Sequence, residues 1–348
     1  MKKTTKAILS LSLFCIILGG AAALFGSLNG GIEAIQKATQ PQKVDKNITS
    51  FKELNLDLPM RHLTIEPSKD NNWHLSYYTD DKILGKVQVR QEEETLNLKQ
   101  NPQGSFSSGI ITTFGYYLNH WDNRNNEYQT IVLSVPKETQ MKTIKGYVSG
   151  NTRLYNLKLE NLNLSSEDIY TDEVTINQGT LSATGLFLDN TQVEQLNLTD
   201  YNYLSLTNSN LKHAKLAADY ASTDIDNSQL HNTTLNANNN TLKLTNTLLD
   251  NVTLLGEYND ISATRLKLQN LVDISNAYNS IDINLDDKTK ATTNLNLTVT
   301  DAKLDLSKAI IGTSSIASDD DGQRFHKQVK DNTATLTIRN KEANLAVN

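Results

Sequence analysis

Residues 204–270 repeat one pattern every nineteen positions, and this repeat is the strongest indication of the fold. In blocks that begin at Leu204, Thr223, Leu242 and Ile261, it reads LSLTNSNLKHAKLAADYAS, TDIDNSQLHNTTLNANNNT, LKLTNTLLDNVTLLGEYND and ISATRLKLQN. The first, third and eighth positions of each block are apolar, except for the threonine that opens the second block. A fixed period near twenty is typical of a β-solenoid, in which successive coils of the chain stack along one axis.

Within each block the pattern alternates with a period of two, as expected for β-strands. Leu204 and Leu206 share one side of a strand, and Ser205 points to the other side. The charged residues of later blocks, such as Asp224 and Lys243, fall on the same side as Ser205. We therefore predict a narrow core made of columns of leucine and isoleucine, with the charged side chains outside.

Asparagine occupies two further columns of the repeat. Asparagine tolerates left-handed backbone dihedrals at turns, and stacked asparagine side chains hydrogen-bond to each other along the axis. Scattered surface asparagines are the alternative interpretation, but they would not keep the coil period. The two predicted columns are Asn208, Asn227 and Asn246, and Asn232, Asn251 and Asn270.

Upstream of this stretch the spacing predicts longer coils. Leu157, Leu181 and Leu204 are separated by twenty-four and twenty-three residues, and residues 181–190 match residues 261–270 closely. Downstream, Leu271 adds one residue, which we expect a turn to absorb. The fold class predicted is all-β, a single-stranded β-solenoid with coils of about 19–24 residues, preceded by one transmembrane helix.

Composition limits the classes of function. The chain has 348 residues, of which 38% are hydrophobic and 6% aromatic, and these fractions suit a solenoid with a single-file core. Its net charge is −6, and it lacks a face rich in lysine and arginine, so nucleic acid is not expected as a partner. Cys15 is the single cysteine, which excludes intrachain disulfides and cysteine-based zinc sites.

The N-terminus predicts a membrane anchor. Three lysines within residues 1–6 precede residues 7–28, which carry no charge and are long enough to span a bilayer. The lysines place residues 1–6 in the cytoplasm. The expected location is therefore the cell membrane, with a single pass, a stalk at residues 29–50 and an extracellular C-terminal domain. A signal peptide cleaved near residues 21–23 is the alternative.

The extracellular part divides into two regions. Residues 51–148 alternate in short strands, interrupted at residues 102–127 by a segment rich in aromatic residues. Residues 149–348 are predicted to form the solenoid, with closing strands at residues 335–338 and 343–347.

Several strand patterns resemble a known family. The patterns are Phe51-Lys-Glu-Leu-Asn-Leu-Asp-Leu58, Leu63-Thr-Ile-Glu-Pro67, Leu96-Asn-Leu98 and Ile131-Val-Leu-Ser-Val-Pro-Lys137. They are similar to the putative-adhesin family of β-strand-repeat proteins, DUF4097, over most of residues 51–348. The resemblance implies a membrane-anchored bacterial surface protein with a role in adhesion or envelope stress. This chain differs from many members in carrying asparagine and leucine where they carry glycine at the coil turns.

Motifs for catalysis, cofactor binding or metal binding are absent from the sequence. His213 and His231 are interpreted as solvated turn residues, because no carboxylate or nucleophile recurs beside them at the coil spacing. Ser318-Asp-Asp-Asp-Gly322 lacks the alternating ligands and distant glutamate of a calcium loop. We expect no enzymatic activity, no cofactor and no metal. A β-helix enzyme acting on cell-surface polysaccharide is the competing class.

Two groups of aromatic residues are candidates for contact with a cell-envelope or host-surface partner. The first lies in the aromatic segment, which alternatively caps the end of the solenoid. The second shares the nineteen-residue period and alternatively shields an edge of the core. A pentapeptide-repeat-like binding protein is the alternative family, since Ser209-Asn-Leu211 resembles its units. The candidate contact residues are Phe114, Tyr116, Tyr117, Trp121, Tyr201, Tyr220 and Tyr258.

Overall fold

The computed structural model describes most of the chain, namely residues 12–17, 19–20, 25–79, 85–101, 113–115, 117–118, 127–199, 201–312 and 314–348. Contacts divide the chain into two compact units. The N-terminal unit comprises Met1–Val44, Tyr77–Val87 and Asn101–Thr130. The solenoid unit comprises Asp45–Ser76, Gln88–Gln100 and Ile131–Asn348.

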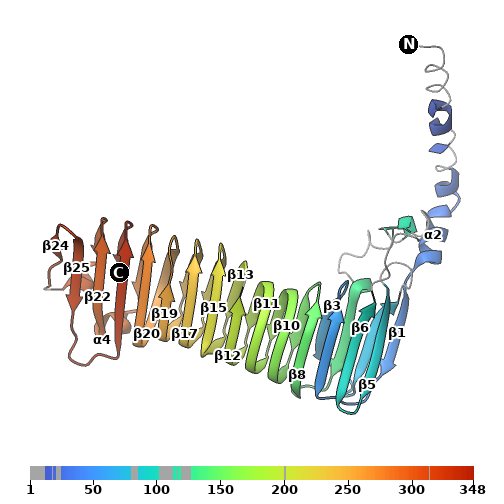
Figure 1. Cartoon of the computed structure of the whole chain (residues 1–348), viewed down its shortest axis with the longest axis horizontal. Helices are drawn as coiled ribbons and strands as arrows, with labels where there is room; N and C mark the ends of the chain where they lie inside the picture. Colours follow the sequence, from blue (N-terminus) through green and yellow to red (C-terminus); the bar gives the residue numbers. More distant parts are fainter. Residues whose placement is uncertain are drawn as a thin grey trace, which may run out of the picture. The chain divides into compact units, whose positions relative to one another are not determined.

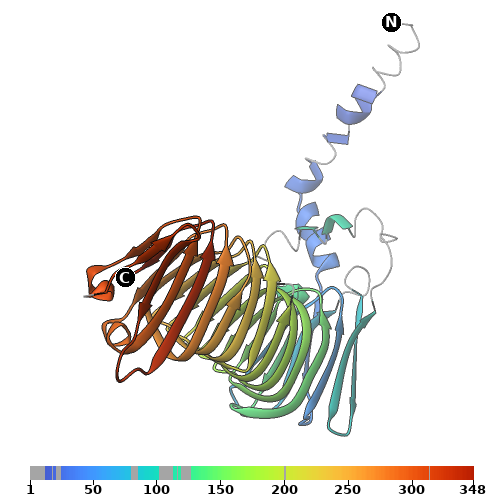
Figure 2. The same ribbon diagram turned by 60° about the vertical axis from the view of Figure 1, so that its left-hand side comes forward.

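The solenoid unit is a stack of three-sided coils. In one coil, β13 (Tyr203–Thr207), β14 (Asn210–Lys212) and β15 (Ala214–Asp219) form three faces, here called face 1, face 2 and face 3. In the next coil, β16 (Ser222–Asp226) pairs with β13, and β17 (Gln229–Asn238) pairs with both β14 and β15. All these pairings are parallel, and Figures 1 and 2 show the coils following one another along the solenoid.

The other strands of the central coils continue these faces in both directions. The strand β11 forms parts of all three faces, because it bends at the corners without a break in strand conformation. The same holds for β10 and β20. The bounds are β8 (Thr139–Val148), β9 (Thr152–Tyr155), β10 (Leu157–Asp172), β11 (Thr175–Asp189), β12 (Gln192–Thr199), β18 (Thr241–Thr245), β19 (Leu248–Leu255), β20 (Asp260–Ala277) and β21 (Ile281–Leu285).

The predicted core columns are confirmed. Leu204 and Leu206 of β13 are fully buried, and Leu211 of β14 is as well. The residues that stack on them in the following coils are at most 6% exposed. Burial of these columns on all three faces removes a large apolar area from water, which is the main favourable term in folding.

The prediction of longer upstream coils is wrong. Leu159 pairs with Ile176, seventeen residues on, and Leu186 pairs with Leu204, eighteen residues on. The coil then lengthens to nineteen residues at Leu204 and Thr223. Residues 181–190 and 261–270 begin on different faces, so their match is not a coil repeat. Alternation with a period of two is the same on every face, and it does not determine which face a strand occupies.

The extra residue at Leu271 lies at a corner, as predicted. The pairing of β19 with β20 shifts register after Asp250, and Leu271 is 53% exposed. The insertion therefore leaves the core columns in register. The coil has three unequal sides, which differs from the equal five-residue sides of the pentapeptide alternative.

The C-terminal strands close the solenoid by insertion. The strand β26 (Ala334–Lys341) lies between β20 and β22 (Thr293–Thr300), in parallel with both. The last strand, β27 (Leu345–Val347), lies likewise between β21 and β23. The strand β25 pairs with β22 in antiparallel fashion and so covers its edge. The remaining bounds here are α4 (Asp287–Thr292), β23 (Leu304–Leu306), α5 (Lys308–Ile311), β24 (Ala317–Asp319) and β25 (Gly322–Lys327).

Parallel stacking also includes strands from the predicted region 51–148. The strand β2 (Glu53–Leu58) pairs with both β8 and β6, and β3 (His62–Pro67) pairs with β9. The strand β4 pairs in antiparallel fashion with β7. The remaining bounds are β1 (Gln42–Asn47), β4 (His74–Thr79), β5 (Lys86–Glu92), β6 (Thr95–Asn101), the 3₁₀ helix η1 (Glu127–Gln129) and β7 (Thr130–Val135).

The N-terminal unit contains the helix α2 (Gly31–Thr39), in which no residue is buried. Residues 12–17, 19–20 and 25–28 are also helical, so the structure describes only part of the expected anchor at residues 7–28. Among the described residues, no helix is both long enough and apolar enough to cross a membrane.

Candidate binding surface

Each corner of the nineteen-residue coils turns on one residue with left-handed backbone dihedrals. In all three corner columns, amide N–H groups of such residues donate to a carbonyl of the next coil, as from Asn227 to Thr245 at 3.0 Å. This lets the chain change direction without breaking the hydrogen bonds between coils. The three corner columns are Asn208, Asn227, Asn246 and Arg265; His213, Asn232, Asn251 and Asn270; and Tyr220, Asn239, Tyr258 and Tyr278.

The two predicted asparagine columns are confirmed. Their side chains also bond along the axis, because Asn246 Nδ2 donates to Asn227 Oδ1 at 2.5 Å and Asn251 Nδ2 donates to Asn232 Oδ1 at 3.1 Å. Asparagine is favoured at these corners since its short polar side chain is tolerated in the left-handed region.

The third column, which we call the tyrosine corner, holds bulky residues in the same backbone conformation. Tyr220, Tyr258 and Tyr278 have φ values of 60°, 58° and 69°. A bulky residue at positive φ is an outlier that costs on the order of 1–3 kcal/mol, and such outliers cluster at functional sites. Asn239 shows that the same corner also accepts the cheaper residue.

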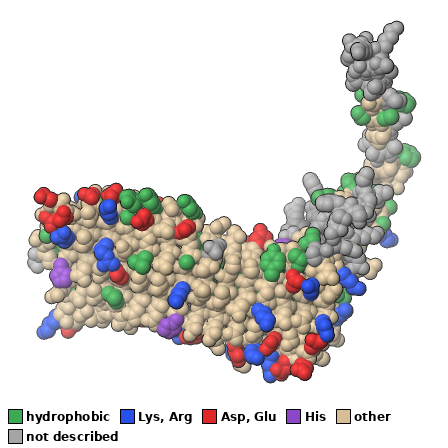
Figure 3. Space-filling view, in the orientation of Figure 1, with side chains coloured by type: hydrophobic (Ala, Val, Ile, Leu, Met, Phe, Trp, Pro, Cys, Tyr) green, Lys and Arg blue, Asp and Glu red, His purple; other side chains and the backbone are tan. Residues whose placement is uncertain are grey.

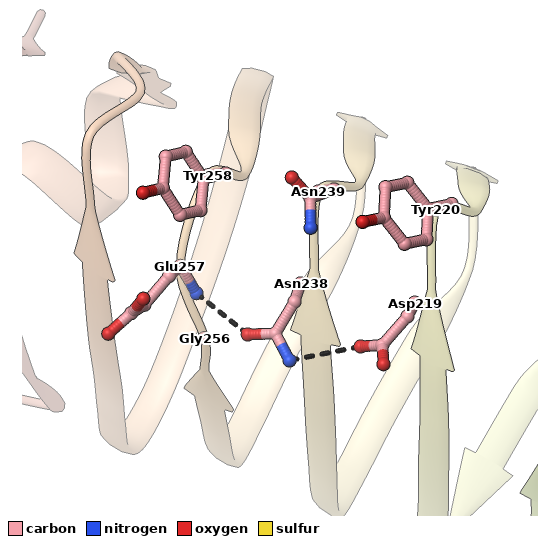
Figure 4. Close-up of a pocket in the computed structure, with 7 residues that line it drawn as sticks. All are labelled: Asp219, Tyr220, Asn238, Asn239, Gly256, Glu257 and Tyr258. Carbon is pink, nitrogen blue, oxygen red and sulfur yellow. Dashed lines mark hydrogen bonds between the residues drawn. The ribbon is translucent and has the colours of Figure 1, made fainter.

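The rings of the tyrosine corner are exposed to solvent. Tyr220 is 78% exposed and Tyr258 is 44% exposed. Tyr258 stacks on Tyr278 with the ring centroids 4.6 Å apart and the planes 17° apart. The smaller side chain of Asn239 separates Tyr220 from Tyr258, and both tyrosine hydroxyls point the same way along the row (Figure 4).

A row of polar side chains runs beside the rings. Asn238 Nδ2 donates to Asp219 Oδ1 at 2.9 Å, and the Glu257 N–H donates to Asn238 Oδ1 at 3.0 Å (Figure 4). These bonds fix the orientation of the amide. The carboxylate of Glu257 has no partner among the described residues. A shallow depression of about 620 Å³ is lined by residues of the tyrosine corner and of this polar row. The lining residues are Tyr220, Asn239, Tyr258, Asp219, Asn238, Glu257 and Gly256.

Hydrophobic and acidic side chains gather along one edge of the solenoid unit in the space-filling view (Figure 3). The exposed hydrophobic residues of the coils that form the tyrosine corner include Leu255, at 41% exposure, besides the tyrosines. An exposed aromatic cluster rimmed by carboxylates and amides is typical of a site that binds a ligand.

Tyr201 does not belong to this exposed row, although it lies nineteen residues before Tyr220. It is 1% exposed, and its hydroxyl lies 3.4 Å from Thr223 Oγ1. Three residues separate Thr199 of β12 from Tyr203 of β13. Four residues separate their partners in the next coil, Ala217 of β15 and Ser222 of β16. The missing residue turns the Tyr201 ring into the core, where burial raises the pKa of its hydroxyl.

The aromatic segment at residues 102–127 belongs to the N-terminal unit and is described in part. Phe114 is 47% exposed and Tyr117 is 61% exposed. Tyr116 and Trp121 lie outside the described residues. Nearby, Gln36 Nε2 of α2 donates to the Leu118 carbonyl at 3.4 Å.

A second aromatic row, which the nineteen-residue period does not predict, lies on face 1 of the upstream coils. Tyr170 and Phe187 stack with centroids 4.5 Å apart, and Tyr203 tilts against Phe187 at 5.3 Å. The Arg153 guanidinium covers the other side of Tyr170 at 5.2 Å. The Tyr203 hydroxyl donates to Asp224 at 2.9 Å. These rings cover each other's faces, so the row favours a stabilising role.

Burial raises the pKa of two hydroxyls in this row. For Tyr203 the loss of hydration is the largest cause, followed by the bond to Asp224. For Tyr170 the cause is again burial, with the nearby charge of Asp168 adding to it. A depression of about 260 Å³ lies beside these residues. Their spacings of seventeen and sixteen residues do not fit the period of nineteen, so the period offered no signal for this row.

The two solenoid histidines lie in different environments. His213 is an exposed corner residue, as expected. His231 is not a solvated turn residue, because it lies in β17 with Nδ1 3.0 Å from Asp250 Oδ2. Within the described residues, no group of three or more His, Cys, Asp and Glu side chains is placed to hold a metal ion. Asp319, from the acidic segment 318–322, pairs with Arg324 at 2.9 Å.

Comparison with known proteins confirms the resemblance drawn from the strand patterns. The family model described as Toastrack DUF4097 matches residues 51–347. No curated protein matches the chain.

Solved structures of similar proteins share little sequence identity with this chain. A putative lipid binding protein from Parabacteroides distasonis ATCC 8503 is 10% identical, covers 88% of this chain and 96% of its own, and has a TM-score of 0.43. A putative adhesin from Bacteroides fragilis NCTC 9343 is 12% identical, covers 89% and 97%, and has a TM-score of 0.35. A putative adhesin from Parabacteroides merdae ATCC 43184 is 11% identical, covers 88% and 95%, and has a TM-score of 0.32.

Proposed function

We propose that this chain, which belongs to the Toastrack DUF4097 family, is a non-catalytic surface protein that binds polysaccharide of the cell envelope or of a host surface. In this proposal the tyrosine corner is the contact surface. The aromatic segment with Phe114 and Tyr117 belongs to the other unit and is a separate, weaker candidate.

One observation carries the proposal: solvent-exposed tyrosines occupy corner positions whose backbone favours asparagine. A ring at Tyr220 gains almost nothing from packing, since 78% of the residue is exposed. Folding therefore does not explain why a costly residue stands there. Binding does, because tyrosine buries a large area at a small cost in rotamer entropy and carries a hydroxyl for hydrogen bonding.

The polar row makes a sugar polymer the best-suited partner class. Carboxylates at Asp219 and Glu257 accept hydrogen bonds from hydroxyl groups, and the fixed amide of Asn238 is placed beside them. Sugars offer both hydroxyl groups for these partners and C–H faces for aromatic rings.

The proposal includes placement at the cell membrane. The lysines of residues 1–6 and the uncharged residues 7–28 support an N-terminal anchor with residues 29–348 outside the cell. External protease applied to intact cells should then degrade the chain. Protection of residues 29–348 while the N-terminus is accessible would reverse this topology.

Binding is tested by sedimentation of the chain with insoluble polysaccharide from bacterial walls and from extracellular matrix. We expect the wild type to pellet, and a Tyr220→Asn, Tyr258→Asn double variant to remain in solution. Asparagine is the substitute of choice because Asn239 already occupies this corner at a φ of 56°. Tyr147→Asn is the matched control, since Tyr147 of β8 is 45% exposed. Equal pelleting of the double variant and the control would remove the support for this site.

The competing class, a polysaccharide-cleaving enzyme, is tested in the same mixtures. Release of new reducing ends, lost on substitution of one solenoid carboxylate such as Asp250, would establish that class. We expect no release.

A further inference from the structure

We propose that the tyrosine corner binds an extended β-1,4-linked polysaccharide that lies along the solenoid axis. This inference rests on the proposed function and names the class of glycan. It follows from the spacing of the rings, the alternation of ring and amide, and the straightness of the polar row.

The spacing of the rings matches a two-sugar repeat. Tyr220 and Tyr258 stand two coils apart, with Asn239 in the coil between them. Adjacent parallel strands are about 4.8 Å apart, so the two rings are about 9.6 Å apart along the axis. A β-1,4-linked chain with equatorial bonds turns each sugar over relative to the last, so every second sugar presents the same face. The repeat of such a chain is two sugars long, and its length is about the distance between the two rings, so the first and third sugars lie over the tyrosines.

The alternation of side chains fits the alternation of sugar faces. Sugars that lie over Tyr220 and Tyr258 place their C–H groups on the rings. The sugar between them lies over Asn239, whose smaller side chain leaves room for the opposite face and its substituents. Tyr278 stacks on one face of Tyr258 with the ring centroids 4.6 Å apart, so a sugar at Tyr258 contacts the opposite face of that ring.

The polar row continues alongside the whole of this path. Asp219, Asn238 and Glu257 follow one another in successive coils, as the rings do (Figure 4). A straight polymer keeps its hydroxyls level with such a row at every sugar. Chains with α-1,4 or β-1,3 linkages curve into helices, so they lose register with the row after one or two sugars.

A cationic ligand fits the same residues less well. An aromatic cage for an ammonium group uses several ring faces that lie within about 6 Å of one point. Tyr220 and Tyr258 are separated by about two strand spacings of roughly 4.8 Å. Tyr278 lies closer to Tyr258 but is stacked parallel to it, so these rings do not converge on one point. The carboxylates alone do not make a site for a cationic peptide.

The test is a calorimetric titration of the full-length chain, kept in solution with a mild detergent, by oligosaccharides of defined linkage and length. We expect β-1,4-linked hexasaccharides of glucose or N-acetylglucosamine to bind at least tenfold more tightly than the disaccharides, which reach one ring only. Isomeric β-1,3-linked and α-1,4-linked hexasaccharides should bind at least tenfold more weakly. Tyr220→Asn and Tyr258→Asn should each weaken hexasaccharide binding at least fivefold, while Tyr147→Asn should leave it unchanged.

The outcomes separate this inference from the proposed function. Pelleting with polysaccharide that depends on the tyrosine corner, but without preference for the β-1,4 linkage, would overturn the inference and leave the function in place. The absence of both pelleting and oligosaccharide binding would overturn both. Full hexasaccharide affinity in the double variant, with circular dichroism unchanged, would show that the glycan binds elsewhere.

Discussion

Replacement of Asn259 with alanine is expected to lower the free energy of unfolding more than any exposed asparagine replacement in this chain. Asn259 is 1% exposed and lies in a buried row that runs inside the tyrosine corner. Its Oδ1 accepts the Asn240 N–H at 3.0 Å, and its Nδ2 donates to the Ala237 carbonyl at 2.7 Å. Asn276 continues the row in the next coil.

The magnitude follows from the groups that the substitution leaves without partners. Alanine leaves the Asn240 N–H and the Ala237 carbonyl buried and unbonded. Each such group costs about 1–3 kcal/mol, so we expect a loss of about 2–6 kcal/mol. Asn236→Ala is the matched control, because Asn236 is an exposed strand residue of β17. A surface substitution of this kind changes stability by about 0.5 kcal/mol or less.

Urea denaturation followed by circular dichroism measures both variants. A clear fall in the midpoint for Asn259→Ala beside an unchanged midpoint for Asn236→Ala is the expected result. Similar midpoints for the two variants would contradict this expectation, since buried and exposed amides would then contribute alike.

Three further outcomes are expected. Asn227→Ala removes a corner residue with its bond along the axis and should cost about 1–2 kcal/mol, whereas Lys243→Ala should cost less than about 0.5 kcal/mol in the same urea assay. Phe187→Ala removes the middle ring of the face 1 row and should lower the free energy of unfolding by about 1–3 kcal/mol, since each of its two aromatic pairs adds about 0.5–1.5 kcal/mol beyond its buried area. A loss smaller than that for Lys243→Ala would contradict a stabilising role for the stack. Hydrogen bonds from His74 and Asn72 hold the pKa of Asp70 well below its usual range. Its contribution to stability is therefore present above the unfolded-state pKa and is lost as the pH falls through the folded-state pKa. The stability difference between wild type and Asp70→Asn should therefore shrink in acid, and a difference that grows as the pH falls would reverse the sign.

The sequence predicts those parts of the fold that depend on a constant period. The corner columns through Asn227 and Asn232 were predictable, because each combines a fixed interval of nineteen residues with a residue type suited to left-handed dihedrals. Upstream of Leu204 the interval changes from seventeen to eighteen residues, and the alternation alone does not assign strands to faces. The insertion of β26 between β20 and β22 joins segments far apart in sequence, and no local pattern indicates it.

The candidate site was predictable only in part, for related reasons. Tyr220 and Tyr258 share a coil position, but whether a ring points inward depends on the number of residues in each corner. One residue fewer turns Tyr201 into the core. The burial of Asn259 was not predictable, because Asn259 follows the exposed Tyr258 directly and a count of asparagines does not separate inward from outward positions.

Chemical labelling of tyrosine shows whether glycan covers the tyrosine corner in the unaltered protein, because it needs no substitution. The full-length chain is nitrated with tetranitromethane, with and without a saturating β-1,4-linked hexasaccharide, and each site is measured by mass spectrometry. We expect Tyr220 and Tyr258 to be labelled in the free protein and protected in the complex, while the exposed Tyr147 is labelled equally in both and the buried Tyr201 in neither. Equal labelling of Tyr220 and Tyr258 with and without bound glycan would contradict the assignment of the tyrosine corner as the binding surface.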